Sequence, residues 1–285
     1  PVLVDVDPIN FNIDIAAIEK AITPKTKAII PVHLFGLAAN MDEVMALAEK
    51  HNLYVIEDNA QGIGATYTSK TGQKKMTGGI GHVGSTSFFP SKNLGCYGDG
   101  GAIFTNDDDL AHVIRGIVNH GMYKRYHHDV VGVNSRLDSI QAAVLRAKLP
   151  KLDQYNTTRR NTARKYTMAF AGIQNIVTPT GFCDSSSSIC DTCDCHVFHQ
   201  YTLQVKNIDR DALVAHLNAN DIPCGVYYPI PLHLQKAYAD TRYKEANFTV
   251  TNTLVKEVVS LPMHTELDDE QIAFITKTLI DFVTK

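Results

Sequence analysis

One lysine of this sequence lies in a short turn rich in glycine, where its amine would be held by backbone. Lys92 follows a strand-like run that stops at Pro90, and four glycines lie within residues 95–101. Glycine lets the main chain pass close to whatever the lysine touches. A positioned lysine amine forms Schiff bases with carbonyl compounds and with pyridoxal phosphate. Taken alone, the pattern also fits a surface lysine in a hairpin, so its neighbours must decide.

A carboxylate is expected near this lysine. Residues 53–56 form an apolar, buried-type strand, and Asp58 lies just beyond its end. Ligands of open α/β sheets bind at the carboxyl ends of strands. A carboxylate there can pair with a pyridinium nitrogen and keep pyridoxal phosphate an electron sink. Asp58 alone would also fit a turn or capping role, but together with Lys92 it favours the chemical interpretation.

The elements that must position these residues alternate between strand and helix patterns, which is typical of a parallel sheet with crossover helices. Residues 62–84 and 120–135 are expected to be loops, and a helical pattern over 137–170 is broken at Pro150. Strands are expected at residues 2–6, 28–32, 53–56 and 102–105, and helices at 13–22, 41–51 and 107–119, the last two capped by Asn40 and Asn106.

The pattern predicts an α/β fold in two domains. A large domain spans residues 1–150, and a smaller α+β domain with its bridging helix spans 151–285. The chain enters on a strand-like run at Pro1, so we expect an internal start, with the N-terminal part of the large domain missing. In the small domain, strands are expected at 197–205 and 224–228, and helices at 209–218 and 268–283.

Composition excludes several classes of protein. The 285 residues carry 27 basic and 30 acidic side chains, and no basic stripe indicates nucleic-acid binding. No apolar run reaches membrane-spanning length and no signal peptide is recognised, so no membrane partner is expected. Six cysteines do not make a disulfide scaffold in a chain this long, which favours a cytoplasmic protein.

Two further motifs invite other functions. Gly79, Gly81 and Gly84 match the dinucleotide fingerprint in spacing, but a loop precedes them and a strand follows, so we reject it. The polar insert from Cys183 to Cys195 ends in a cysteine-rich run before a histidine. Zinc sites usually pair two separated ligand knuckles, so we expect a surface excursion without metal.

Three motifs, at residues 57–62, 87–102 and 132–143, resemble those of the DegT/DnrJ/EryC1/StrS aminotransferases, and the resemblance runs over nearly the whole chain. It implies a fold-type I enzyme with a mostly parallel large domain, a smaller α+β domain and pyridoxal 5'-phosphate as cofactor. The substrates would be a nucleotide-linked keto-sugar and an amino-acid donor, glutamate, which leaves as 2-oxoglutarate.

The resemblance also implies residue roles. Lys92 would carry the cofactor and move the proton, and Asp58 would pair with the pyridine nitrogen. Gln61 would bond the cofactor's ring oxygen and Ser87 its phosphate. Asn134 would reach the phosphate of the partner subunit, so that a homodimer shares its active sites.

The form of the third motif, with Ser135, resembles members that act at the sugar's C3. The motif around Lys92 is most similar to the group acting on UDP-2-acetamido-2-deoxy-3-keto-glucuronate, which implies surface polysaccharide synthesis. Arg136 could then bind the sugar carboxylate, although a surface ion pair is the simpler interpretation. His33, His199 and His233 flank the expected site, and each is expected to be structural or, as proposed for His233, to contact substrate.

Other interpretations stay open. The sugar could be aminated at C4, or the chain could be a non-catalytic relative that binds pyridoxal phosphate or a nucleotide-sugar for regulation. A dehydratase of the same family carries histidine in place of the lysine, and Lys92 argues against it. Relative to the family, we expect the N-terminal segment whose helix start binds the phosphate to be missing here, so that either the chain is a fragment or cofactor binding is impaired.

Overall fold

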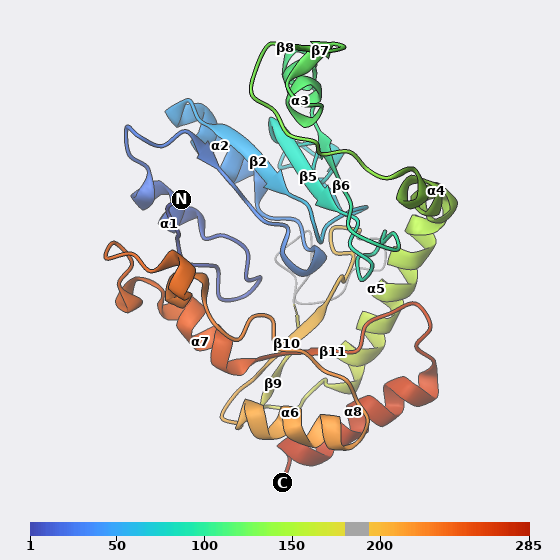
Figure 1. The fold of residues 1–285 in the computed structure, drawn as a ribbon. Coiled ribbons are helices and arrows are strands. Elements are labelled where there is room, and N and C mark those ends of the chain that lie inside the picture. The colour runs from blue at the N-terminus through green and yellow to red at the C-terminus, as the bar shows by residue number, and fades with distance from the viewer. Residues whose placement is uncertain (180–193) are drawn as a thin grey trace.

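Four strands form the sheet of the N-terminal part of the chain (Figure 1). β1 (Ala28–Ile29), β2 (Tyr54–Asp58) and β5 (Val83–Ser87) pair in parallel, and β6 (Gly101–Phe104) adds an antiparallel edge in the order β1-β2-β5-β6. This computed structural model describes residues 1–179 and 194–285. The predicted mostly parallel sheet is therefore confirmed.

Helices α1 (Ile15–Ala21) and α2 (Met41–His51) cover this sheet because each buries an apolar stripe. Ile18 of α1 and Met41 and Val44 of α2 pack with Val55 of β2 in one core cluster. The Asp14 side chain accepts a hydrogen bond from the Ala17 amide and so caps α1. This packing fixes where β2 ends.

The predicted long helix with a break at Pro150 is confirmed. α4 (Ser139–Lys148) passes through the 3₁₀ turn η2 (Leu149–Lys151) into α5 (Leu152–Ala169). Leu152 at the start of α5 packs with Phe88 and Leu94 beside the lysine turn. Further along, α5 contributes Tyr166 to the core of the C-terminal part. One helix thus connects the two cores (Figure 1).

The C-terminal part is built on β10 (Tyr201–Val205), which pairs antiparallel with both β9 (Ile176–Val177) and β11 (Val258–Leu261). α6 (Arg210–Ala219) packs on β11 and α8 (Asp269–Val283) packs on α5 and α6, while α7 (Thr249–Glu257) contacts β10 and leads into β11. The antiparallel sheet with helices is the expected α+β arrangement. The boundary at residue 150 stays a prediction.

Both expected loops contain hairpins, so these two predictions are wrong. β3 (Thr66–Thr68) pairs with β4 (Lys74–Met76), and β7 (Met122–Lys124) pairs with β8 (His127–His128). β4 and β8 are exposed along their whole length. An exposed ribbon buries no alternate side chains, so it leaves no apolar period in the sequence.

Two expected strands are reduced to isolated bridges. Residues 2–6 make only the bridge between Val6 and Ile13, and residues 224–228 make only the one between Gly225 and Ser260. The expected strand at 28–32 pairs regularly over β1 alone, with one further bridge from Val32 to Asp58. Apolar runs in these places fill gaps between elements without joining a ladder.

The caps also differ from expectation. α3 (Asp108–Val118) is capped by Asp107, whose Oδ1 accepts from the Leu110 amide at 2.9 Å, and not by Asn106. Asn40 occupies the N-cap position of α2, but its Oδ1 accepts a hydrogen bond from the Tyr67 hydroxyl instead. Among the described helices, none has both the length and the apolar character needed to cross a membrane.

Candidate active site

The Lys92 turn is closed by backbone hydrogen bonds. The Lys92 amide donates to the Phe89 carbonyl at 2.9 Å, and the Cys96 amide donates to the Phe88 carbonyl at 2.8 Å. A Cβ at Gly95 would lie 2.4 Å from the Pro90 carbonyl oxygen, so this position requires glycine. The turn that follows β5 therefore holds the lysine on a rigid support.

A cavity of about 410 Å³ lies over this turn. Burial lowers the pKa of the Lys92 amine, and the Asp58 carboxylate partly offsets this. A larger fraction of the amine is therefore unprotonated than in a solvent-exposed lysine. The cavity is lined by Gln61, Ser87, Phe89, Ser91, Lys92, Asp99, His199, Gln200, Tyr227 and Tyr228.

Asp58 is the last residue of β2, and its backbone is held from both sides. Its amide donates to the Pro31 carbonyl at 2.9 Å, and its carbonyl accepts from the His33 amide at 3.0 Å. On the other side Asp58 is in register with Ser85 of β5. Its Oδ1 accepts from the Ala60 amide at 3.0 Å. The Asp58 carboxylate acts to raise the pKa of the Lys92 amine, but Asp58 is not among the described residues that line the Lys92 cavity, and its pairing with the pyridine nitrogen stays a prediction.

Directly behind Asp58, the side chains of Glu57 and His33 form a buried pair that sequence reasoning missed. Glu57 Oε2 lies 2.8 Å from His33 Nε2, and both side chains are fully buried. Burial acts to raise the pKa of Glu57, but hydrogen bonds from His33 and from backbone amides hold it below its usual range. A charged residue ending a buried strand was the only signal in the sequence.

Gln61 connects two segments that are distant in sequence. Its Oε1 accepts from the Phe35 amide at 2.5 Å, within the turn η1 (Leu34–Gly36), and its Nε2 donates to the Tyr228 hydroxyl at 3.3 Å. Ser87 Oγ accepts from the Phe89 amide at 3.2 Å. Both side chains line the Lys92 cavity, as their predicted roles require, and the roles themselves stay predictions.

The flanking histidines occupy different places. His199 lines the Lys92 cavity, whereas His33 lies behind the sheet end with Glu57. His233, in the 3₁₀ turn η3 (Leu232–Leu234), is stacked on Phe248 with ring centroids 4.0 Å apart. Its Nε2 is buried and has no hydrogen-bond partner within the described parts of the chain. His233 is not among the described residues lining the cavity, so its substrate contact remains a prediction.

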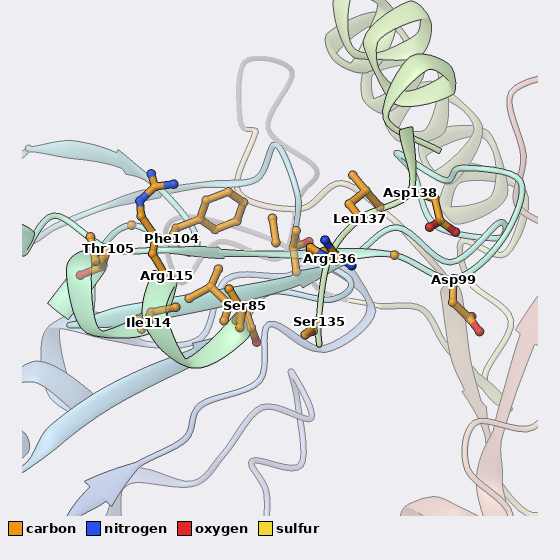
Figure 2. A pocket seen from close by; sticks show the side chains of 18 of the residues that line it. Ser85, Asp99, Phe104, Thr105, Ile114, Arg115, Ser135, Arg136, Leu137 and Asp138 are labelled. Carbon is orange, nitrogen blue, oxygen red and sulfur yellow. The ribbon is translucent and has the colours of Figure 1, made fainter. Parts of the chain in front are cut away.

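Asn134 and Arg136 lie on a different surface. Both are exposed, and Arg136 Nε donates to Asn134 Oδ1 at 2.9 Å. Arg136 lines a second cavity of about 910 Å³ between β6, α3 and the segment that leads into α4 (Figure 2). Within the described residues of one chain, neither side chain lines the Lys92 cavity. Asp99 borders both cavities.

The larger cavity is not where the chemistry of a single chain is assembled. It has apolar walls from Ile103, Phe104 and Leu137, and Figure 2 shows Arg136 and Asp138 near Leu137. Hydroxyl and amide side chains line both cavities, but only the smaller one has a lysine amine among its described lining residues. Group chemistry, not volume, therefore identifies the Lys92 cavity as the candidate active site.

Most of the cysteine insert lies outside the described residues, including Cys183, Cys190 and Cys193. His196, just after the insert, is buried and stacked on Phe198, with ring centroids 3.7 Å apart. Its Nδ1 accepts a hydrogen bond from the Phe198 amide at 3.0 Å. Burial lowers the pKa of His196 to about 3, and a hydrogen bond with the Gly36 backbone offsets this only in part. This histidine serves packing.

Comparisons with known proteins agree with this geometry. The model of the DegT/DnrJ/EryC1/StrS aminotransferase family matches residues 1–280. The chain is 47% identical to the UDP-N-acetyl-3-dehydro-alpha-D-glucosamine 3-aminotransferase of Acidithiobacillus ferrooxidans, over 98% of the chain and 70% of that protein. It is 45% identical to the UDP-2-acetamido-2-deoxy-3-oxo-D-glucuronate aminotransferase of Pseudomonas aeruginosa, over 98% and 72%. A protein of Geobacillus stearothermophilus named pleiotropic regulatory protein is 46% identical, over 99% and 72%.

Solved structures share the fold. DesV of S. venezuelae, in complex with a ketimine intermediate, superposes with a TM-score of 0.90 at 36% identity, covering all of this chain and 72% of that one. NtdA from Bacillus subtilis, with bound cofactor PMP, gives 0.86 at 30% identity, covering all of this chain and 63% of that one. The chain therefore belongs to the DegT/DnrJ/EryC1/StrS aminotransferase family, and it is an aminotransferase whose cofactor is pyridoxal phosphate.

Proposed function

We propose that the chain transfers an amino group from glutamate to C3 of a UDP-linked 2-acetamido-3-keto-hexuronate, in the synthesis of a surface polysaccharide. The observation that carries the proposal is the cavity that the half-buried Lys92 lines together with Gln61 and Ser87, with the Asp58 carboxylate near enough to act on the pKa of the lysine amine. The substrate class comes from two relatives, one named for a 3-dehydro-glucosamine and one for a 3-oxo-glucuronate, both UDP-linked. We place the enzyme in the cytoplasm, where thiols stay reduced.

The residues in and near the cavity fit the cofactor by their chemistry. Lys92 offers an amine whose pKa is lowered by burial, as Schiff-base formation requires. Asp58 offers a carboxylate on a rigid strand end for the pyridine nitrogen. Ser87 offers a hydroxyl for the phosphate, and Gln61 an amide for the ring oxygen. The proposed assignment gives each group one partner and uses no residue twice.

When bound, the cofactor supplies an electron sink that stabilises the carbanion formed at the amino acid's α-carbon. The chain supplies the rest. The Lys92 amine would remove the α-proton of the amino donor and, in the second half-reaction, would deliver a proton to the sugar carbon that receives the amino group. The Asp58 carboxylate keeps the pyridine nitrogen protonated, and because it is fixed by β2 it needs no reorganisation. The hydrogen bond of Gln61 to the Phe35 amide holds its side chain in place during these steps.

We propose a homodimer in which Asn134 and Arg136 act in the partner's site. Both are exposed in one chain, and large apolar side chains around them are exposed as well, with Val131 at 97% and Ile140 at 75%. Such a patch is typical of a protein interface. In the partner's site Asn134 would bond the phosphate and Arg136 the sugar carboxylate, for which a bidentate guanidinium is suited. His233 is proposed to contact substrate as well; its buried Nε2 has no hydrogen-bond partner among the described residues.

The decisive assay supplies glutamate and a small panel of UDP- and dTDP-linked keto-sugars and measures 2-oxoglutarate formation and ketone loss. We expect turnover with the UDP-linked 2-acetamido-3-keto-hexuronate and preference for it over 4-keto sugars. Turnover with 4-keto sugars alone would reassign the chain to C4 amination. Cofactor binding without turnover on any sugar would support a regulatory role, as the name of the Geobacillus stearothermophilus relative suggests for that protein.

A further inference from the structure

One histidine of the Lys92 cavity has its hydrogen position set by a buried amide network. His199 is 6% exposed, and its ring lines the cavity together with Lys92. Its Nδ1 lies 3.3 Å from Oδ1 of Asn93, the residue next to the lysine. Which atom donates in this contact decides what the other ring nitrogen offers to a ligand.

The amide network fixes the direction of that hydrogen bond. Asn93 Nδ2 lies 2.8 Å from Asn156 Oδ1 and 3.0 Å from the Val197 carbonyl oxygen. A carbonyl oxygen only accepts, so the nitrogen of the Asn93 amide must face it, and Asn93 Oδ1 must face His199. Asn156 is oriented in the same way by its donation to the Ile63 carbonyl at 3.2 Å. His199 Nδ1 therefore carries the hydrogen.

Burial, helped by the positive charges around it, keeps the ring neutral. Burial lowers the pKa of His199 to about 3, and the positive charges of Lys92 and Arg159 add to the effect. Arg159 is itself buried and donates to the carbonyls of Phe198 and His199. The carboxylates on this side are Asp58, which acts on Lys92, and Asp99, which borders the cavity. With Nδ1 protonated and the ring neutral, Nε2 bears a free lone pair.

That lone pair is open to the cavity. Among the described residues, no donor bonds His199 Nε2. His233 Nε2 is buried from solvent and has no hydrogen-bond partner in the described chain. His199 Nε2 is not among the atoms buried in this way. A neutral acceptor thus faces the space into which the substrate must bring its reacting carbonyl beside Lys92.

We propose that His199 Nε2 accepts a hydrogen bond from a donor group on a carbon flanking the sugar's reacting carbonyl, which makes His199 a specificity-determining residue. The identity of the ligand rests on the proposed function, whereas the protonation state of the His199 ring does not. In a 2-acetamido-3-keto sugar the flanking donors are the C4 hydroxyl and the C2 acetamido N–H. A hydrogen-bonding site discriminates against a substrate that lacks the donor, because the acceptor is then left buried and unpaired.

The state of the ring is read by ¹⁵N NMR of the histidine-labelled protein, with and without cofactor, and with the His199 signal assigned from His199→Phe. We expect Nδ1 protonated and Nε2 unprotonated from pH 6 to 8 in both forms, because the network lies behind the cavity. Adding the UDP-linked 2-acetamido-3-keto sugar should shift the Nε2 resonance toward that of a hydrogen-bonded acceptor. An Nε2–H tautomer, or an imidazolium at pH 6, overturns the proposal.

Kinetics identify the donor. The sugar is compared with its 4-deoxy analogue and with an analogue carrying a 2-acetoxy ester in place of the acetamido group. His199→Phe should lower kcat/KM for the intact sugar by about tenfold to a hundredfold and lose this effect with whichever analogue lacks the donor. His199→Gln, whose amide can both donate to Asn93 and accept, should recover part of the loss.

The half-reaction with glutamate separates this inference from the proposed function. His199→Phe should lower the sugar half-reaction at least about tenfold more than the glutamate half-reaction, because only the sugar brings the flanking donor group to Nε2. Equal loss of both half-reactions would mean a structural role and overturn the proposal. If the wild type runs neither half-reaction, the proposed function fails, and the NMR titration alone decides whether Nε2 accepts a bond from the sugar.

Discussion

His33 Nε2 donates a 2.8 Å hydrogen bond to Glu57 Oε2, and both side chains are fully buried behind the end of the sheet that carries Asp58. The direction is fixed because His33 Nδ1 accepts from the Ala39 amide at 3.1 Å, which leaves Nε2 as the protonated nitrogen. The same carboxylate accepts from three amides of the segment before β5, Gly78, Ile80 and Gly81, at 2.6 to 2.7 Å. One carboxylate thus connects His33 and the segment before β5 to the end of β2, where Asp58 lies.

Glu57→Gln should destabilise the protein strongly. The new amide NH₂ must face at least one N–H donor, so a buried donor is left unsatisfied, and the charge that offset four donors is lost. Breaking one side of a buried charged network costs about 3–5 kcal/mol of unfolding free energy. Urea denaturation followed by circular dichroism measures it. Glu19→Gln, at the exposed pair with Lys50, is the matched control and should stay close to wild type.

The same pair predicts a pH dependence. The pKa of Glu57 is held below its ordinary 4.5 in the folded chain. A carboxyl with a depressed pKa contributes stability above the unfolded-state pKa, and this contribution is lost as pH falls through the folded value. The difference in unfolding free energy between wild type and Glu57→Gln should therefore be constant near neutral pH and shrink below about pH 4.5. A difference that grows on acidification would contradict the assignment.

Lys92→Ala should abolish covalent attachment of the cofactor while keeping the fold. Borohydride reduction of the loaded wild type should fix the label on the peptide containing Lys92, which peptide mass spectrometry identifies. Lys92→Ala should take no label, and its absorbance spectrum with cofactor is compared with that of wild type. Lys50→Ala, an exposed lysine paired with Glu19, should label as wild type does. A label on another lysine in the wild type would exclude Lys92.

Asp58→Asn should keep the fold and largely lose transamination, because a neutral amide does not keep the pyridine nitrogen protonated. Activity within about tenfold of wild type, roughly 1.4 kcal/mol of barrier, would show that the carboxylate is not needed. Asp14→Asn is the control, since this residue caps α1 and asparagine caps as well as aspartate. It should leave turnover unchanged.

Local patterns predicted the sheet end because residues 53–56 are continuously apolar and the polar residues come at once after them. The break at Pro150 followed from proline chemistry in the same way. The Glu57–His33 pair and the contact of His199 with Asn93 could not be predicted, because their partners are 24 and 106 residues apart and depend on how the elements pack. The β3–β4 and β7–β8 hairpins were not predicted for another reason: β4 and β8 are exposed, so their sequences need no alternation of apolar residues.

A shared active site makes a prediction that a single-chain site does not. Asn134 and Arg136 are exposed around the larger cavity, away from the residues that line the Lys92 cavity of their own described chain. If they act in the partner's site, two inactive homodimers should complement each other. One carries Lys92→Ala and the other carries changes to alanine at both Asn134 and Arg136.

After subunit exchange, each mixed dimer would hold one intact site and one site with both defects. Random exchange of equal amounts makes half of the dimers mixed, so about a quarter of wild-type activity should return. Glutamate-dependent turnover is measured after exchange has been verified with two differently tagged subunits. The control mixes Lys92→Ala with Asp58→Asn, two residues that one chain brings together, and should stay inactive because every site keeps a defect. If the first mixture stays inactive although exchange is verified, Asn134 and Arg136 do not act in the partner's site.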